Sequence, residues 1–229
     1  MKLTPRLQAV ADFVEKGSAI ADVGSDHGYL SVYLKENDRA DKVIASDINQ
    51  GPVNNAISTV RQCGFSSEID VRLGGGLTPY LIGELNSCAI AGMGGILIRD
   101  ILIESKELVD TLDYMILQPQ IAQDELRRWL INNGFKIEDE KVAIEGSKIY
   151  EIIKVKKGIM EIGDEINLEI GYKLLKKNDH DSIRFIENKI SKYAHIKNSI
   201  TKQGSESAKV LLKEIDEKLT KLNEVRECL

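Results

Sequence analysis

The sequence has few of the residues that bind metals or form disulfides. Its three cysteines, Cys63, Cys88 and Cys228, are odd in number and lie far apart. A disulfide framework has an even number of cysteines, and a zinc site has paired ligands a few residues apart. Of the three histidines, only His27 lies within a motif. We therefore expect free thiols and no metal site.

The chain also lacks any apolar run of about 18 residues, the length that a membrane-spanning helix needs. Residues 1–17 are amphipathic and have no continuous apolar region followed by a small-residue cleavage site, which argues against a signal peptide. We expect a cytoplasmic protein without membrane contact. The formal net charge is −5, so binding a nucleic acid would require positive charge gathered on one face.

The pattern of apolar residues predicts two domains. Residues 1–157 alternate strand-like runs with helix-like segments, and they end in two successive strands, 135–144 and 149–155. We predict an α/β fold: a Rossmann-like sheet with helices on both faces and a closing antiparallel hairpin. Residues 158–229 have a helical pattern alone, which predicts a C-terminal helical, coiled-coil-like domain.

One stretch, residues 18–47, organises the first domain. It predicts a strand, a glycine turn, a helix and a second strand that ends on Asp47, where an acid can accept hydrogen bonds from ribose hydroxyls. Only Gly24 and Gly28 lie in the turn, so the dinucleotide fingerprint G-x-G-x-x-G is incomplete. The carboxylates of Asp22 and Asp26 would repel phosphates. They favour a ligand with a cationic amino-acid end, which points to S-adenosyl-L-methionine rather than NAD.

Glycine-rich segments also follow two later strands. The first is residues 74–76. The second is residues 91–95, with the sequence Ala-Gly-Met-Gly-Gly, and we expect a helix over residues 96–106 to follow it. Binding sites lie at the carboxyl ends of parallel strands, where glycine lets the backbone approach a ligand. After the fifth strand, Gln118 and Gln120 flank Pro119. These amides either contact a base or cap the helix over residues 121–132.

Three helical segments carry polar faces whose function the sequence does not decide. In the helix over 121–132, we expect Leu126, Trp129 and Leu130 on one face and Arg127 and Arg128 on the other. A helix over 164–177 precedes a hairpin whose two helices are separated by Gly204 and Ser205. The lysines of this helix and of the hairpin form either a solvated face or a phosphate-binding face. These are Lys173, Lys176, Lys177, Lys189, Lys192 and Lys197.

Three motifs together resemble one family. Residues 22–30 read Asp-Val-Gly-Ser-Asp-His-Gly-Tyr-Leu, residues 91–95 read Ala-Gly-Met-Gly-Gly, and residues 117–119 read Leu-Gln-Pro. The chain resembles the bacterial tRNA (adenine(22)-N1)-methyltransferases, the TrmK family, over essentially its whole length. The resemblance implies a class I fold, S-adenosyl-L-methionine as cofactor, tRNA as partner and methylation of a ring nitrogen of one adenine. It implies a coiled-coil C-terminal domain as well.

The chain departs from the family after the third strand. The family usually has Gly-Asp-Gly-Leu, whereas Gly75 replaces the acid here. If that acid contacts the adenine amine of the cofactor, its loss lowers cofactor affinity by about 1.5–3 kcal/mol. After Pro119 the family often has Asn, and this chain has Gln120, which is a milder change.

On these grounds we predict two groups of site residues. For the cofactor they are Asp22, Gly24, Ser25, Gly28 and Asp47, with the backbone of Gly74, Gly75, Ala91, Gly92 and Met93 closing the pocket. On the catalytic, substrate side they are Asp26, His27, Tyr29, Gln118 and Pro119. Tyr29 would stack on the base or else pack in the core. Asp26 or His27 would accept a proton from the adenine amine, or His27 would only stabilise the loop.

Two other functions stay open from the sequence. A small-molecule methyltransferase would share the cofactor motifs but need no C-terminal helices. A non-catalytic module that binds RNA or protein would keep the fold without holding cofactor. The replacement of the family's acid by Gly75 leaves this alternative open. We expect a monomer, with the C-terminal helices as the surface of any homodimer.

Overall fold

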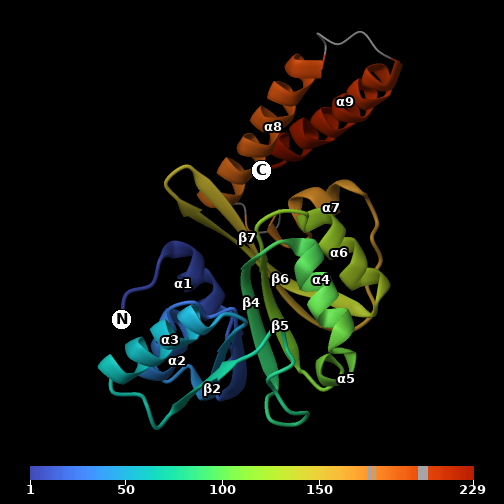
Figure 1. The fold of residues 1–229 in the computed structure, drawn as a ribbon. Coiled ribbons are helices and arrows are strands. Elements are labelled where there is room, and N and C mark those ends of the chain that lie inside the picture. The colour runs from blue at the N-terminus through green and yellow to red at the C-terminus, as the bar shows by residue number, and fades with distance from the viewer. Residues whose placement is uncertain (175–176, 178, 201–205) are drawn as a thin grey trace. The chain divides into compact units, whose positions relative to one another are not determined.

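The computed structural model describes residues 1–174, 177, 179–200 and 206–229. The chain forms two compact units, residues 1–161 and 162–229. The first is built on one seven-stranded sheet with the strand order β3-β2-β1-β4-β5-β7-β6 (Figure 1). The strands are β1 (Ser18–Val23), β2 (Ala40–Asp47), β3 (Ile69–Leu73), β4 (Ser87–Met93), β5 (Tyr114–Pro119), β6 (Phe135–Glu145) and β7 (Lys148–Lys157).

The sheet has the topology that the sequence predicted. Strands β1 to β5 are parallel, and β1 lies between β2 and β4, with Val23 opposite Ser46 and Ile90. The hairpin of β6 and β7 closes the sheet, because β7 runs antiparallel to both β5 and β6. The carboxyl ends of all five parallel strands therefore meet at one edge, and the Rossmann-like fold class is confirmed.

Helices cover both faces of this sheet (Figure 1). Helix α2 contacts both α1 and α3, and α4 contacts α6. They are α1 (Pro5–Asp12), α2 (Tyr29–Glu36), α3 (Gln50–Gln62), α4 (Gly95–Glu104), α5 (Lys106–Val109) and α6 (Gln123–Asn132). None of the helices among the described residues is long and apolar enough to cross a lipid bilayer.

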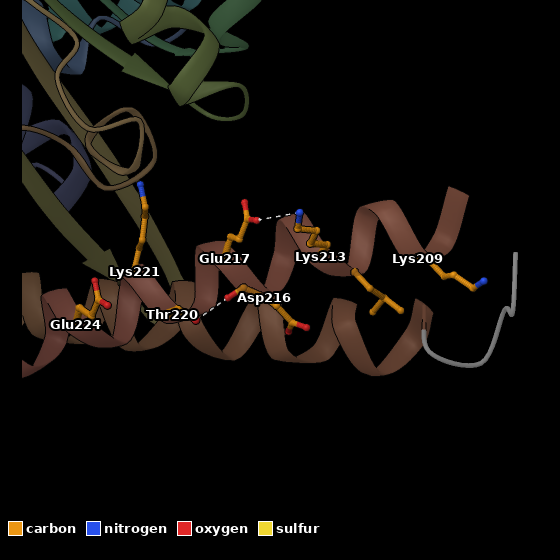
Figure 2. Close-up of a pocket in the computed structure, with 8 residues that line it drawn as sticks. Lys209, Lys213, Asp216, Glu217, Thr220, Lys221 and Glu224 are labelled. Carbon is orange, nitrogen blue, oxygen red and sulfur yellow. Dashed lines mark hydrogen bonds and ion pairs between the residues drawn. The ribbon is translucent and has the colours of Figure 1, made fainter. Parts of the chain in front are cut away.

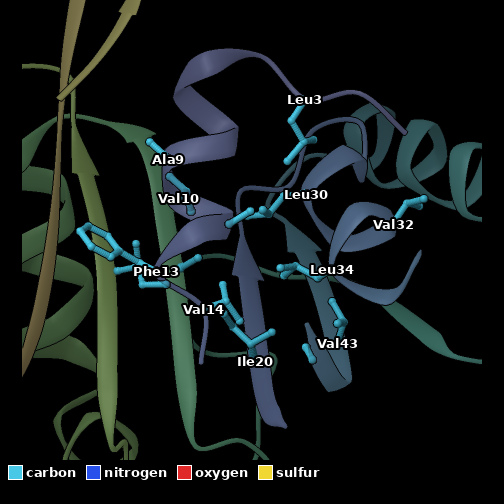
Figure 3. Close-up of a cluster of buried hydrophobic side chains, with 14 of the residues drawn as sticks. Leu3, Ala9, Val10, Phe13, Val14, Ile20, Leu30, Val32, Leu34 and Val43 are labelled. Carbon is cyan, nitrogen blue, oxygen red and sulfur yellow. The ribbon is translucent and has the colours of Figure 1, made fainter. Parts of the chain in front are cut away.

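A buried cluster joins α1 to the strands beneath it. Val10, Ile20 and Leu34 have no exposed surface, and they pack with other apolar side chains of α1, β1, α2 and β2 (Figure 3). Thr4 caps α1, because its Oγ1 accepts a hydrogen bond from the backbone N–H of Leu7 (3.4 Å). Burial of this much apolar surface holds the N-terminal helix against the sheet.

Three predicted helices differ from the observed ones. The helix expected over 96–106 is broken at Ser105 between α4 and α5. The helix expected from Ile121 begins at Gln123, because Ala122 has a left-handed φ of 56°. Of the helix expected over 164–177, residues up to 174 form α7 (Ile166–Ile170), which ends at Gly171, where φ is 85°. Residues 175, 176 and 178 lie outside the described residues, including the predicted Lys176.

The predicted polar face of α6 is wrong at Arg127. Its side chain is fully buried, and it forms ion pairs with Glu140 of β6 (2.8 Å) and Glu151 of β7 (2.7 Å). Burial alone would lower the pKa of Arg127, but the two carboxylates raise it above its ordinary value. Arg128, the next residue, is exposed. The guanidinium therefore ties the helix to the closing hairpin.

The second unit contains the predicted helical hairpin. Helices α8 (His180–Ile200) and α9 (Glu206–Glu227) pack side by side, and Gly204 and Ser205 lie outside the described residues. The pairs Lys197–Asp216 (2.6 Å) and Arg226–Glu187 (3.6 Å) show that the helices are antiparallel.

Two lysines of the face whose role the sequence left open, Lys189 and Lys197, take part in ion pairs within this unit. Besides the pair of Lys197, Lys189 lies 3.2 Å from Glu169 of α7 and is mostly buried. Lys218 of α9 contacts the same carboxylate at 3.4 Å. Opposing charges hold the pKa of Glu169 below its ordinary value, although burial alone would raise it. Lys189 therefore joins helices, and Lys192 is an exposed lysine of the predicted face.

Candidate functional site

A cavity of about 500 Å³ opens at the carboxyl edge of the parallel strands. It is lined by the ends of β1, β2 and β4, by the loop after β3 and by one side of α4 along its length. Seven of the residues predicted for the cofactor lie on its wall. They are Gly24, Asp47, Gly74, Gly75, Ala91, Gly92 and Met93.

Gly24 sits where the first strand turns into this cavity. Its φ is +73°, and its backbone N–H donates to the carbonyl of Ser46 (2.8 Å). A Cβ at this position would lie 2.5 Å from Cε of Met93. The turn therefore needs glycine for its backbone conformation and for the space that it leaves beside Met93.

Asp47 lies at the end of β2 and faces the same cavity. Its Oδ1 accepts a hydrogen bond from the backbone N–H of Asn49 (2.9 Å), which orients the carboxylate. The side chain is half-buried rather than enclosed. This is the place and the chemistry that recognise a pair of ribose hydroxyls.

The loop after β3, residues 74–78, forms another part of the wall of this first cavity. Gly75 has room for a side chain only if Ile48 moves, because a Cβ there would lie 3.1 Å from Cδ1 of Ile48. Ile48 is 70% exposed, so it can shift toward solvent. Gly74 is more restricted, because a Cβ there would lie 2.4 Å from Cγ of Pro79.

A second cavity of about 250 Å³ adjoins the first. The two share Gly24 and Ala91, so they meet at the end of β1 and β4. Predicted residues from both groups line the second cavity: Asp22, Gly24, Ser25, Asp26, His27, Tyr29 and Ala91. It is smaller than the roughly 300–1,000 Å³ pockets that enclose whole drug-sized ligands. One small group or flat ring suits it.

Asp22 is a buried acid at the wall of this second cavity. Its Oδ2 accepts hydrogen bonds from Ser25 Oγ (2.7 Å) and Ser31 Oγ (2.6 Å). Burial raises its pKa, and the two serine hydroxyls oppose that rise only in part. A ligand cation beside Asp22 would favour its ionised form, so the site suits an ammonium group.

His27 and Tyr29 form an aromatic surface at the rim of the second cavity. Their ring centroids are 5.2 Å apart and the planes differ by 19°, which is a stacked arrangement. Tyr29 is 44% exposed, so its alternative role in the core is excluded. His27 Nε2 lies 3.4 Å from the carboxylate of Asp26, whose φ is +43°. Acid, imidazole and phenol thus face solvent together.

Three predicted site residues lie away from both cavity walls. Gln118 is fully buried: its Oε1 accepts from Arg6 Nη1 (3.0 Å) and from the backbone N–H of Gly92 (3.1 Å). Pro119 is also buried, and its carbonyl accepts from Gln118 Nε2 (3.1 Å). Gly28 caps α2, where a Cβ would lie 3.3 Å from Cα of Ala56. In this structure, therefore, these three support the site rather than face it.

Arg6 lines the second cavity although it belongs to no sequence motif. It lies in the first turn of α1, and its backbone N–H donates to Glu145 of β6 (2.8 Å). Its Cζ lies 5.7 Å from the ring centroid of Tyr150 in β7. No local pattern marks such a residue, because its partners come from distant parts of the chain. Ile48 and Leu97 of the first cavity were missed for the same reason.

A separate shallow depression follows α9 in the second unit (Figure 2). Its charged lining residues are evenly divided between lysines and carboxylates, and Lys213 pairs with Glu217 at 3.9 Å. The charged residues are Lys209, Lys213, Lys221, Asp216, Glu217 and Glu224. Without an excess of positive charge, this surface has no evident preference for phosphate.

The sheet order, the closing antiparallel hairpin and the two joined cavities define a Rossmann-like methyltransferase. Residues 3–153 match the family model described as Methyltransferase domain. A curated Bacillus subtilis protein named tRNA (adenine(22)-N(1))-methyltransferase is 38% identical over 172 residues, which cover 75% of this chain and 72% of that protein. The chain belongs to the tRNA (adenine(22)-N1)-methyltransferase family.

Solved structures agree over the whole chain. The B. subtilis m1A22 tRNA methyltransferase TrmK is 33% identical with a TM-score of 0.85, and the match covers 98% of this chain and 99% of that one. Streptococcus pneumoniae Sp1610 in complex with S-adenosyl-L-methionine is 30% identical with a TM-score of 0.87, covering 98% and 100%. Mycoplasma capricolum TrmK with S-adenosyl-homocysteine is 26% identical with a TM-score of 0.82, covering 100% and 99%.

Proposed function

We propose that this protein transfers the methyl group of S-adenosyl-L-methionine to N1 of adenine 22 in tRNA. One observation carries the proposal: the cavity lined by Asp47 adjoins, at Gly24 and Ala91, a second cavity whose rim carries the stacked rings of His27 and Tyr29. A cofactor and a base held in these cavities would meet at that junction. Family membership supports the same reaction. Because tRNA is the substrate, we place the protein in the cytoplasm.

The residues of the first cavity fit this cofactor. Asp47 would accept hydrogen bonds from the ribose, and the glycine turn at Gly24 leaves room for the ligand beside Met93. Asp22, on the wall of the adjoining second cavity, would pair with the ammonium of the amino-acid end. The cofactor supplies a methyl group on a sulfonium, which is strongly electrophilic.

The residues of the second cavity have simple tasks in the reaction. N1 of adenine is neutral and has its own lone pair, so the protein need not remove a proton before attack. Tyr29, stacked on His27, would hold the base in line. Asp26 or His27 would accept a proton from the amine after transfer. Alignment of nitrogen and methyl group in a site shielded from water accounts for most of the acceleration.

The test is to incubate the protein with labelled S-adenosyl-L-methionine and unmodified tRNA transcripts, and to map the methyl group. We expect one label, at N1 of adenine 22, and no label when that adenine is replaced by guanine. Label on small molecules alone, retained after removal of residues 162–229, would identify a small-molecule methyltransferase. Failure to bind the cofactor in a calorimetric titration would identify a non-catalytic module.

A further inference from the structure

Ile121 is an exposed apolar side chain at the carboxyl edge of the sheet. It follows the end of β5 at Pro119, and it is 67% exposed. A Cβ on Gly94 would lie 3.6 Å from Cγ1 of Ile121. Gly94 directly follows Met93, which lines the first cavity. The side chain of Ile121 therefore lies beside the loop that carries the wall of the cofactor cavity.

The backbone around Ile121 is fixed by its neighbours. The N–H of Gln120 donates to the carbonyl of Met93 (2.8 Å), and the carbonyl of Ile121 accepts from the N–H of Gly95 (2.9 Å). Ala122 has a φ of +56°, a costly conformation for a residue with a side chain, and such strain clusters at active sites. A Cβ on Gly95 would overlap the carbonyl oxygen of Ala122, so the loop and the start of α4 pack backbone against backbone. Ile121 is therefore held toward solvent by a rigid support.

Two further apolar side chains continue this surface. Ile96 and Leu97 lie in the first turn of α4, and they are 39% and 53% exposed. Leu97 also lines the first cavity. We call Ile96, Leu97 and Ile121 the apolar rim. Single exposed apolar residues are ordinary on protein surfaces, whereas a group of them at the mouth of a binding cavity marks a contact surface.

The position of the apolar rim selects the part of the RNA that would cover it. The target adenine must reach the methyl group where the two cavities meet, at Gly24 and beside Met93, so the RNA that carries it lies over the rim. The three side chains of the rim carry no charge and offer nothing to a phosphate. The faces of bases stack on flat or apolar surfaces. The bases next to the target adenine are therefore the partner that fits.

The target adenine also has to leave its stack before it can enter a pocket, and unstacking costs free energy. Proteins that unstack bases insert apolar side chains, isoleucine among them, into the gap between base steps. Burial of one isoleucine side chain gains free energy of the same order as the cost of unstacking one step. A rigidly supported side chain loses little conformational entropy when it inserts.

We propose that Ile121 is a wedge that enters the space which the target adenine leaves in the base stack of the tRNA, and so stabilises the unstacked state. Ile96 and Leu97 support the same contact from α4. This inference rests on the proposed function, because it takes tRNA as the substrate. It adds the loop after β5 to the RNA-binding surface and leaves cofactor binding unaffected.

The experiment measures unstacking directly, with a tRNA transcript that carries the fluorescent base 2-aminopurine at position 22. Its fluorescence rises when the base leaves the stack. Wild type saturated with S-adenosyl-L-homocysteine should produce this rise. Ile121→Ala should reduce the rise by about half or more and lower kcat/KM for unmodified tRNA about tenfold, because less apolar surface fills the gap. Calorimetry should give the same affinity for S-adenosyl-L-homocysteine in both proteins.

Two further variants serve as controls. Ile121→Leu keeps an apolar side chain of the same volume and should stay close to wild type in both measurements. Ile82→Ala makes the matched substitution at another isoleucine, which is 59% exposed in the loop that precedes β4. It should change neither the fluorescence rise nor kcat/KM.

Other results would overturn the proposal. Wild-type values in Ile121→Ala would mean that RNA does not cover this side chain. A full fluorescence rise with a lowered kcat/KM would assign Ile121 to alignment of the base rather than to unstacking, and a weakened affinity for S-adenosyl-L-homocysteine would assign it to the cofactor cavity. Methyl transfer by wild type without any fluorescence rise would refute the wedge and leave the proposed function standing. Absence of methyl transfer to tRNA by wild type would refute both.

Discussion

Gly24 and Met93 are in contact across the mouth of the cofactor cavity, such that a Cβ on Gly24 would lie 2.5 Å from Cε of Met93. Two strand ends, of β1 and of β4, approach each other there because one of them carries no side chain. Gly24 also has a φ of +73°, so both its backbone conformation and the space beside Met93 favour glycine.

Gly24→Ala should weaken S-adenosyl-L-homocysteine by at least about tenfold. The new methyl group pushes Met93 into the cavity, and an alanine with positive φ costs about 1–2 kcal/mol. Calorimetry measures the affinity, and chemical denaturation measures the stability. Gly64→Ala is the matched control, because Gly64 has a φ of +82° and nothing within 4 Å of an added Cβ. It should lose similar stability without losing affinity. Wild-type affinity in Gly24→Ala would contradict this account.

Tyr29→Ala should impair methyl transfer to tRNA while leaving cofactor affinity unchanged. Stacking on a base contributes ~1–3 kcal/mol, so we expect kcat/KM to fall roughly 5- to 150-fold. Steady-state kinetics with tRNA transcripts measures kcat/KM, and calorimetry measures the affinity for the cofactor. Tyr29→Phe keeps the ring and should stay close to wild type. If kcat/KM fell as far in Tyr29→Phe as in Tyr29→Ala, the hydroxyl of Tyr29, and not stacking by its ring, would be what the reaction needs.

Gly75→Asp should strengthen cofactor binding, because it restores the acid that the resemblance places after the third strand. A hydrogen bond to a charged group contributes about 1.5–3 kcal/mol, so we expect the affinity to rise roughly 10- to 150-fold. Ile48 must move to admit the side chain, and its 70% exposure allows this. Thr78→Asp adds the same charge elsewhere on the cavity wall and serves as the control. If both variants raised the cofactor affinity equally, the added negative charge alone, and not a hydrogen bond from residue 75, would explain the gain.

Arg127→Met should destabilise the first unit by about 3–5 kcal/mol, because it leaves two buried carboxylates, Glu140 and Glu151, without their cation. Urea denaturation of both proteins measures the difference. Arg128→Met, at the neighbouring exposed position, should cost less than about 1 kcal/mol. If the two variants had the same stability, the buried ion pairs would contribute nothing beyond packing.

Glu84→Gln should lower stability at neutral pH and have less effect in acid. Hydrogen bonds from Arg72 lower the pKa of Glu84 to about 2, although burial opposes the shift. A lowered pKa in the folded state adds stability above the unfolded value of 4.5, and this stability is lost as the pH falls toward 2. The variant should therefore lose about 1 kcal/mol at pH 7. Urea midpoints of wild type and Glu84→Gln, measured at pH 7 and at pH 3, check this. A difference between the two proteins that is as large at pH 3 as at pH 7 would refute it.

Much of the first unit could be predicted because its signals are local. Glycines that need positive φ, such as Gly24, and an acid that ends a strand, such as Asp47, are visible in the sequence. The parallel sheet and its closing antiparallel hairpin followed from the alternation of strand-like and helix-like segments, whereas the order of the strands came from the structure. Two helix boundaries were predicted wrongly because nearby residues do not mark them. Neither the break at Ser105 nor the left-handed conformation of Ala122 has a glycine or proline at that position.

The sequence by itself determined the strand ends, the glycine turns and the family, because each depends on neighbouring residues or on a short motif. Only the tertiary structure decided which charges are buried and which side chains share a cavity. Arg127 looked like a surface residue until β6 and β7 brought two carboxylates to it. Arg6 and Gln118 are 112 positions apart in the chain and 3.0 Å apart in space. A contact of that kind exists only after the chain has folded, so no local preference encodes it.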